Sequence, residues 1–125
     1  SNSALDGVST SLPAVTRSLK LQKRASKEGF DWNNPQDTLK KVKEELLELT
    51  IEMKSNNKKK IKEELGDLLF SCINLSRKLG LDTETVIRES NRKFEKRFKK
   101  MEKNMNSKKL DWKHKNLESE WQKSK

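Results

Sequence analysis

Two stretches decide the fold: PQDTLKKVKEELLELTIEMK at residues 35–54 and KKKIKEELGDLLFSCINLSRKL at residues 58–79. In both, apolar residues recur every three to four positions, which is the period of an amphipathic α-helix. Asn34 and Pro35 supply the N-cap and the first helical position of the earlier stretch. The polar residues 55–57 separate the two stretches as a turn, so they are predicted to form an antiparallel hairpin.

Glycine and proline mark the other helix ends. A first helix is predicted between Pro13 and Gly29, and Gly80 is predicted to end the helix of residues 58–79. Further helices are expected at residues 82–105 and 112–122. Because no alternating β-branched run predicts a strand, the expected fold class is all-α. It is an antiparallel helical bundle of four main helices plus a short C-terminal helix, completed by dimerisation.

The size and composition fit one small domain with a thin core. The chain has 125 residues, of which 30% are hydrophobic and 38% charged. A single helical layer of this composition buries one stripe per helix, which is why an oligomer is expected. Residues 1–10 are predicted to be a flexible lead-in that begins with a vector-derived remnant, and residues 11–125 a single domain. The sequence is also compatible with a fragment of a longer protein.

Charge and cysteine usage narrow the function classes. The net charge of +10 attracts anions in general, namely nucleic acid, an anionic membrane surface or a polyphosphate, and does not choose among them. The single cysteine, Cys72, excludes an internal disulfide and fits a cytoplasmic setting. No run of about 18 apolar residues predicts a membrane span. No membrane partner is therefore expected.

Each helix of the hairpin carries two carboxylates spaced i, i+3: Glu45 with Glu48, and Glu64 with Asp67. At about 100° per residue, both pairs border their apolar stripe on the same side. An antiparallel hairpin relates its helices by an approximate two-fold axis, so all four carboxylates emerge on one side. The midpoint between the pairs is residue 56, the middle of the predicted turn. The four groups are therefore expected to meet at one height.

Four carboxylates this close repel one another strongly. Either some stay protonated or a hard cation neutralises them, and an oxygen-only ligand set favours Mg²⁺, with Mn²⁺ as a possible substitute, over zinc. The alternative is that each acidic pair belongs to a solvated face and forms ion pairs with lysines such as Lys41. The matched side and level of the two pairs favour the metal site.

The helix of residues 82–105 supplies possible anion-binding groups. Lys93 and Arg97 border its apolar stripe at i, i+4, where they are either solvated charges or partners of a polyphosphate. Asn91 falls on the stripe, as a buried amide or as a ligand contact. Trp121 either docks the last helix or stacks on a base. Cys72 is expected to be a core thiol.

These motifs, in this order, resemble a known family. Glu44-Glu45-x-x-Glu48 followed by Glu64-x-x-Asp67 is similar to the signature of MazG-type nucleoside triphosphate pyrophosphohydrolases, of the all-α NTP pyrophosphatase superfamily. Gly29-Phe30-Asp31-Trp32 before the hairpin and Asn91-x-Lys93-Phe94-x-x-Arg97 after it strengthen the match. The lead-in from Ser11 resembles the start of the C-terminal domain in two-domain members.

The resemblance implies Mg²⁺-dependent hydrolysis of nucleoside triphosphates to the monophosphate and pyrophosphate, by a homodimer or higher homo-oligomer. It implies metal ligation by Glu45, Glu48, Glu64 and Asp67. It also implies phosphate or nucleotide contacts, which we expect from Lys41, Lys60, Asn91, Lys93, Arg97 and Trp121. The general base is expected among Glu44, Glu45 and Glu48, and the preferred base and sugar stay open. The main alternative is a non-catalytic, basic helical module that binds nucleic acid. A purely structural oligomerisation domain is a third reading.

Overall fold

A computed structural model describes residues 2–125, apart from the side chains of His114 and Lys115. Its five helices are α1 (Ala14–Lys27), α2 (Pro35–Glu52), α3 (Lys58–Lys78), α4 (Thr83–Ser107) and α5 (His114–Lys123). Residues 2–125 contain no strand, which confirms the all-α prediction. No helix in this described range combines the length and apolarity needed to cross a membrane. The chain divides into two compact units, one up to Glu84 and one from Thr85 onward.

Local capping explains where the helices begin and end. The Asn34 side chain accepts a hydrogen bond from the Asp37 N–H at 2.8 Å, as expected for the N-cap of α2. Gly29 (φ 91°) and Gly80 (φ 73°) follow α1 and α3 in the left-handed conformation that glycine adopts without strain. The observed ends differ from the predicted ones by up to two residues: α2 ends at Glu52 rather than at residue 54, α4 continues to Ser107, and α5 starts at His114 rather than at residue 112.

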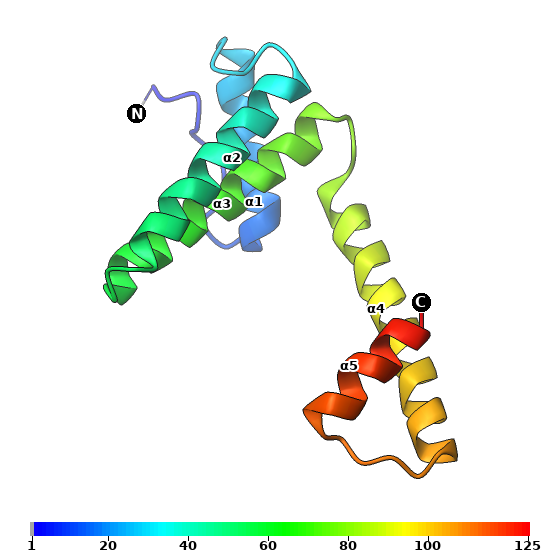
Figure 1. The fold of residues 1–125 in the computed structure, drawn as a ribbon. Coiled ribbons are helices and arrows are strands. Elements are labelled where there is room, and N and C mark those ends of the chain that lie inside the picture. Colours follow the sequence, from blue (N-terminus) through cyan, green and yellow to red (C-terminus); the bar gives the residue numbers. More distant parts are fainter. Residues whose placement is uncertain (1) are drawn as a thin grey trace. The chain divides into compact units, whose positions relative to one another are not determined.

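The first unit is built on the α2–α3 hairpin, with α1 packed against α3 (Figure 1). The chain reverses at residues 53–57, where Asn56 adopts a positive φ of 57°. The residues that are most buried in these two helices are polar: Thr38 and Glu45 on α2, and Ser71 and Asn74 on α3. The two helices therefore meet along an edge made of small and polar side chains.

The apolar stripes of α2 and α3 are less buried than the sequence predicts. Leu46 is 51% exposed and Leu65 is 43% exposed. Cys72 is also exposed, so the prediction of a core thiol is wrong. Other residues of the two stripes, among them Val42, Leu49 and Leu68, are half-buried. In the second unit Met101 and Met105 are buried, whereas Phe94 remains 58% exposed.

An ion-pair network ties the loop before α2 to the end of α3. Arg77 donates from Nη2 to Asp31 Oδ1 at 2.7 Å and from Nη1 to Oδ2 at 3.2 Å, and the Lys78 ammonium lies 3.3 Å from Oδ2. Ser26 donates a further hydrogen bond to Asp31 at 2.9 Å. The hydrogen bonds from Arg77 hold the pKa of Asp31 well below its usual range, against the opposing effect of burial.

Substitution Asp31→Asn should destabilise the protein because it leaves Arg77 without its anionic partner. We expect the free energy of unfolding at pH 7 to fall by about 2 kcal/mol. A carboxylate with a lowered pKa stabilises the fold above its unfolded pKa of about 3.9, and this stabilisation is lost as the pH falls. Urea unfolding between pH 3 and 7 should therefore show a steeper acid loss in the wild type than in Asp31→Asn. Equal stability of the two proteins at pH 7 would contradict this role.

Candidate metal centre

Three carboxylates converge where α2 and α3 pack together. One oxygen each of Glu45, Glu48 and Glu64 lies within 4.8 Å of the other two. Glu48 and Glu64 are equidistant from Asn56 in the sequence, so the antiparallel hairpin places them at the same level. Glu45 is only 6% exposed, Glu64 is half-buried, and Glu48 is open to solvent. The group therefore has a buried side and an accessible side.

The crowding of this group is reflected in a raised pKa and in carboxylate oxygens without hydrogen-bond partners. Loss of hydration raises the pKa of Glu64, and its hydrogen bond with Glu48 and the charges of Glu48, Asp67 and Glu45 act in the same direction. Oε2 of Glu45 and Oε2 of Glu64 are buried and accept no hydrogen bond from the described residues. Bare carboxylate oxygens at this spacing, with oxygen as the donor throughout, fit a hard divalent cation such as Mg²⁺ or Mn²⁺.

Asp67, the fourth predicted ligand, lies at the margin of this group. It is exposed and does not belong to the set of oxygens within 4.8 Å of one another. Its charge nevertheless helps to raise the pKa of Glu64, three residues earlier on α3. Its direct ligation of a metal stays a prediction.

Lys41 partly neutralises the acidic group instead of pointing away from it. Its ammonium lies 3.0 Å from Glu45 Oε1 and 3.6 Å from Glu44 Oε2. The hydrogen bond to Glu45 raises the pKa of Lys41. Glu44, one of the three candidate bases, is exposed and lies outside the three-carboxylate group. The lysine pairing that the alternative interpretation expected is therefore present, but within the described part of the chain the ion pairs of Lys41 go to Glu44 and Glu45 and not to Glu48 or Glu64.

A cavity of about 310 Å³ opens beside Glu48 and Glu64. It is lined by Glu48, Ile51, Glu52, Lys60, Glu63 and Glu64. Lys60, a predicted nucleotide contact, thus lies in the same cavity as two of the clustered carboxylates. A phosphate group entering here would meet one ammonium, while carboxylates line the rest of the polar wall.

The remaining predicted nucleotide contacts belong to the second unit. Arg97 places its guanidinium carbon 3.7 Å from the centre of the Trp121 ring, and donates to the Trp121 carbonyl from Nε at 3.1 Å. A cavity of about 530 Å³ is lined only by Lys93, Lys96, Arg97, Lys100, Ser124 and Lys125. Asn91 is exposed and not part of this lining. The second unit thus offers a cationic cavity suited to an anion.

Comparison of the sequence with known proteins identifies the family of this chain. Residues 33–102 match the MazG nucleotide pyrophosphohydrolase domain. The chain belongs to the MazG family. It is 42% identical over 101 residues to the nucleoside triphosphate pyrophosphohydrolase/pyrophosphatase MazG of Thermotoga maritima, and 43% identical over 103 residues to the nucleoside triphosphate pyrophosphohydrolase of Escherichia coli K12. These matches cover 81% of this chain but only 38% and 39% of the two relatives.

Two acidic residues of this MazG domain escaped the sequence analysis, Glu52 and Glu63. Both line the cavity beside Glu48, and Oε2 of Glu52 is buried without a hydrogen-bond partner among the described residues. The signal was present for Glu52, because it lies one helical turn beyond Glu48 on the same face. Glu52 and Lys60 are also equidistant from Asn56, so the hairpin register places them opposite each other.

Removing one charge from the acidic group should have opposite effects with and without metal. Without divalent cations, Glu64→Gln should unfold at a higher temperature than the wild type because it relieves repulsion. With millimolar Mg²⁺ or Mn²⁺, the wild-type midpoint should rise by roughly 5 °C while that of Glu64→Gln stays unchanged. Thermal unfolding followed by circular dichroism measures both effects.

Glu44→Gln is the matched control for this experiment, since it removes an equal charge from an exposed neighbour of Glu45. It should keep the metal-dependent rise. A loss of the rise in Glu44→Gln, or its persistence in Glu64→Gln, would mean that the cation binds elsewhere.

Proposed function

We propose that this chain hydrolyses nucleoside triphosphates at the α–β phosphoanhydride and releases a nucleoside monophosphate and pyrophosphate, with Mg²⁺ as cofactor. The observation that carries the proposal is the convergence of Glu45, Glu48 and Glu64 with two buried carboxylate oxygens left bare, in a chain of the MazG family. The names of both relatives describe this class of activity.

The carboxylates of α2 and α3 would hold the cation. Glu45, Glu48 and Glu64 supply oxygens from both helices, and Asp67 adds negative charge beside them. When bound, Mg²⁺ offsets the charge of the triphosphate and lowers the pKa of a coordinated water. The buried position of Glu45 fixes one ligand inside the fold, whereas the exposed Glu48 faces incoming solvent and substrate.

A proton must leave the attacking water, and Glu48 is the best-placed acceptor. Glu45 Oε1 already accepts a hydrogen bond from Lys41, and Glu44 lies outside the cavity lining. Glu48 is exposed in the cavity and shares a hydrogen bond with Glu64. Its carboxylate can therefore accept the proton from a water held in the cavity.

Cationic side chains would then stabilise the negative charge on the phosphates. Lys60 lines the cavity beside Glu48, and Lys93 and Arg97 line the cationic cavity of the second unit. Each can donate to phosphate oxygens as charge builds on the leaving pyrophosphate. The Trp121 carbonyl and ring restrain the guanidinium of Arg97, which lowers the entropic cost of ordering it on substrate.

Incubation with a nucleoside triphosphate and Mg²⁺ should produce monophosphate and pyrophosphate in equal amounts. Glu48→Gln and Asp67→Asn should lower kcat by at least about 100-fold without a change in helical content, because they remove charge at the metal centre. Ion-exchange chromatography of the nucleotides and a coupled pyrophosphate assay measure these outcomes. Glu28→Gln, which removes an exposed carboxylate at the end of α1, serves as the control.

Two results would refute the proposal. Release of diphosphate and inorganic phosphate would place cleavage at the wrong bond. Unchanged turnover in both Glu48→Gln and Asp67→Asn would separate the reaction from the acidic group.

We also propose that the active form is a homodimer or higher homo-oligomer that covers the outward face of the hairpin. The large apolar side chains that stay exposed on α2 and α3 are Leu39, Leu46, Leu47, Ile51, Leu65, Leu69 and Phe70. An exposed apolar surface of this extent is typical of an interaction site. A second copy of the chain offers a matching apolar surface to bury against it.

Sedimentation should therefore give a mass of at least twice the 14.6 kDa of one chain. Leu46→Glu should shift the protein toward monomer because it places a charge on the apolar face. Lys43→Glu, on an exposed polar position of α2, should leave the mass unchanged. A monomeric wild type at micromolar concentration would contradict this assembly.

A further inference from the structure

Glu120 of α5 is a buried carboxylate in the second unit, with only 2% of its surface exposed. Its Oε1 accepts a hydrogen bond from Lys108 Nζ at 2.9 Å, and the ammonium of Lys123 lies 3.6 Å from the same oxygen. The hydrogen bond from Lys108 lowers the pKa of Glu120, against the opposing effect of burial. Because charged side chains are almost never buried to this degree unless they are paired, the ion pair with Lys108 is a defined part of this unit.

Lys108 is held directly after the end of α4. Its N–H donates to the Asn104 carbonyl at 3.0 Å. The Leu110 N–H then donates back to the Met105 carbonyl at 2.9 Å, which closes the C-terminus of the helix. Because the backbone around Lys108 is fixed in this way, the ion pair with Glu120 ties α5 to the end of α4.

The residue that follows Glu120 is Trp121, which contacts α4 in two ways. The centre of its ring lies 5.5 Å from the centre of the Phe94 ring. Its carbonyl accepts hydrogen bonds from Arg97, at 3.1 Å from Nε and also from Nη2. An apolar contact has little directional preference, whereas a carbonyl that accepts two N–H groups needs a defined position. The ion pair of the neighbouring Glu120 supplies that position.

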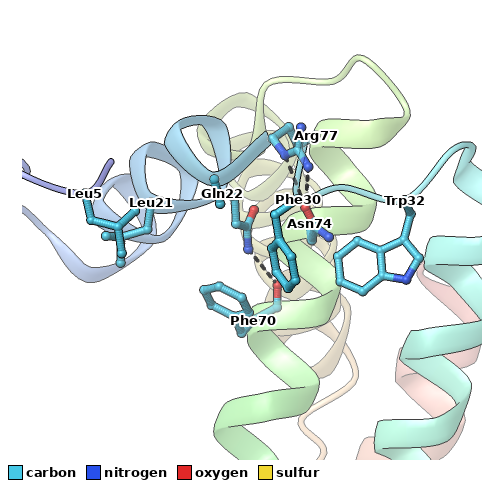
Figure 2. A pocket seen from close by; sticks show the side chains of 9 residues that line it. Leu5, Leu21, Gln22, Phe30, Trp32, Phe70, Asn74 and Arg77 are labelled. Atoms are coloured by element: carbon cyan, nitrogen blue, oxygen red, sulfur yellow. Dashed lines mark hydrogen bonds between the residues drawn. The ribbon is translucent and has the colours of Figure 1, made fainter. Parts of the chain in front are cut away.

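Arg77 of the first unit shows what an arginine held in this way can bind. It lines a cavity together with Gln22 and Asn74 (Figure 2). Its Nε and Nη2 donate to one neutral oxygen, Asn74 Oδ1, at 3.1 and 2.8 Å. The edge formed by Nη1 and Nη2 donates to the two carboxylate oxygens of Asp31. A neutral oxygen on one edge of the guanidinium therefore leaves the other edge for an anion.

Arg97 is held on the same edge of its guanidinium. Because Nε and Nη2 donate to the Trp121 carbonyl, the edge formed by Nη1 and Nη2 is the one that can meet an anion. Arg97 also lines the cationic cavity with Lys93. A phosphate in this cavity could accept two N–H groups from Arg97, as Asp31 does from Arg77. This arrangement requires the Trp121 carbonyl to stay on the Nε edge.

We propose, resting on the proposed function, that Glu120 is a positioning residue, which through its ion pair with Lys108 holds the Trp121 carbonyl against Arg97 and so orients the guanidinium toward the substrate phosphates. Glu120 itself does not touch the substrate. Without the ion pair, the apolar contacts between α5 and α4 allow the Trp121 carbonyl to move. Arg97 then loses more conformational entropy when it binds a phosphate, and its contribution to the reaction is weakened.

Glu120→Gln tests this role because it keeps the size of the side chain and removes its charge. We expect kcat/KM for a nucleoside triphosphate to fall by about 10-fold, with unchanged helical content at the assay temperature. Glu118→Gln, which changes an exposed carboxylate of the same helix, should leave kcat/KM unchanged. Lys108→Gln removes the same ion pair from an exposed position and should give the same loss, so it provides the test if Glu120→Gln fails to fold. Wild-type kcat/KM in a folded Glu120→Gln or Lys108→Gln protein would overturn the assignment.

The Arg97→Ala background distinguishes positioning from general support of the fold. If Glu120 acts through Arg97, Glu120→Gln should lower kcat/KM no further in Arg97→Ala protein. Its effect on the midpoint of thermal unfolding should be similar in both backgrounds, because the ion pair with Lys108 is lost in each. Losses of kcat/KM that multiply in the double variant would show that Glu120 does not act through Arg97.

Two measurements without turnover separate failure of this assignment from failure of the proposed reaction. In NMR spectra, Glu120→Gln should shift the Nε–H signal of Arg97, and Glu118→Gln should not. Inorganic pyrophosphate should bind about 10-fold more weakly to Glu120→Gln than to the wild type. If the wild type hydrolyses no triphosphate but both effects are seen, the proposed reaction fails and the positioning role stands. If triphosphates are hydrolysed but the Arg97 signal and pyrophosphate binding do not change, the positioning role fails alone.

Discussion

The register of the α2–α3 hairpin is the constraint on which the candidate site depends. The reversal at Asn56 pairs residues that are equidistant from it, so Glu48 faces Glu64 and Glu52 faces Lys60. Once this register is set, three carboxylates approach within 4.8 Å, and the fold must accept their repulsion. It does so in two ways: Lys41 pairs with Glu45, and the pKa of Glu64 is raised. A cation would remove the remaining cost.

The two units divide the charge of the chain between them. Residues 85–125 contain 14 of the 29 Lys and Arg residues but only 6 of the 19 Asp and Glu residues. The first unit therefore holds most of the carboxylates, including the acidic group, and the second holds the cationic cavity lined by Lys93 and Arg97.

Local signals in the sequence were enough to predict the helices and the level of the carboxylates. The caps at Asn34, Gly29 and Gly80 act within a few residues, and spacing from Asn56 follows from helix geometry. The buried edge was not predictable in this way. Thr38, Glu45 and Ser71 are buried because of how two helices pack, which a single-helix apolar pattern does not encode. The pairing of Asp31 with Arg77 spans 46 residues and left no local trace either. The cavity lined by Gln22 was not predictable from local sequence either, because its walls come from separate segments.

The ion pair between Lys41 and Glu45 has a consequence for how a metal would enter. Lys41 holds Oε1 of Glu45 at 3.0 Å, while Oε2 stays bare on the buried side. The ion pair therefore holds the carboxylate in place before any ligand arrives. A cation would meet a preorganised oxygen and spend less of its binding free energy on ordering it. Lys41 would then tune metal affinity through entropy, without touching the ion.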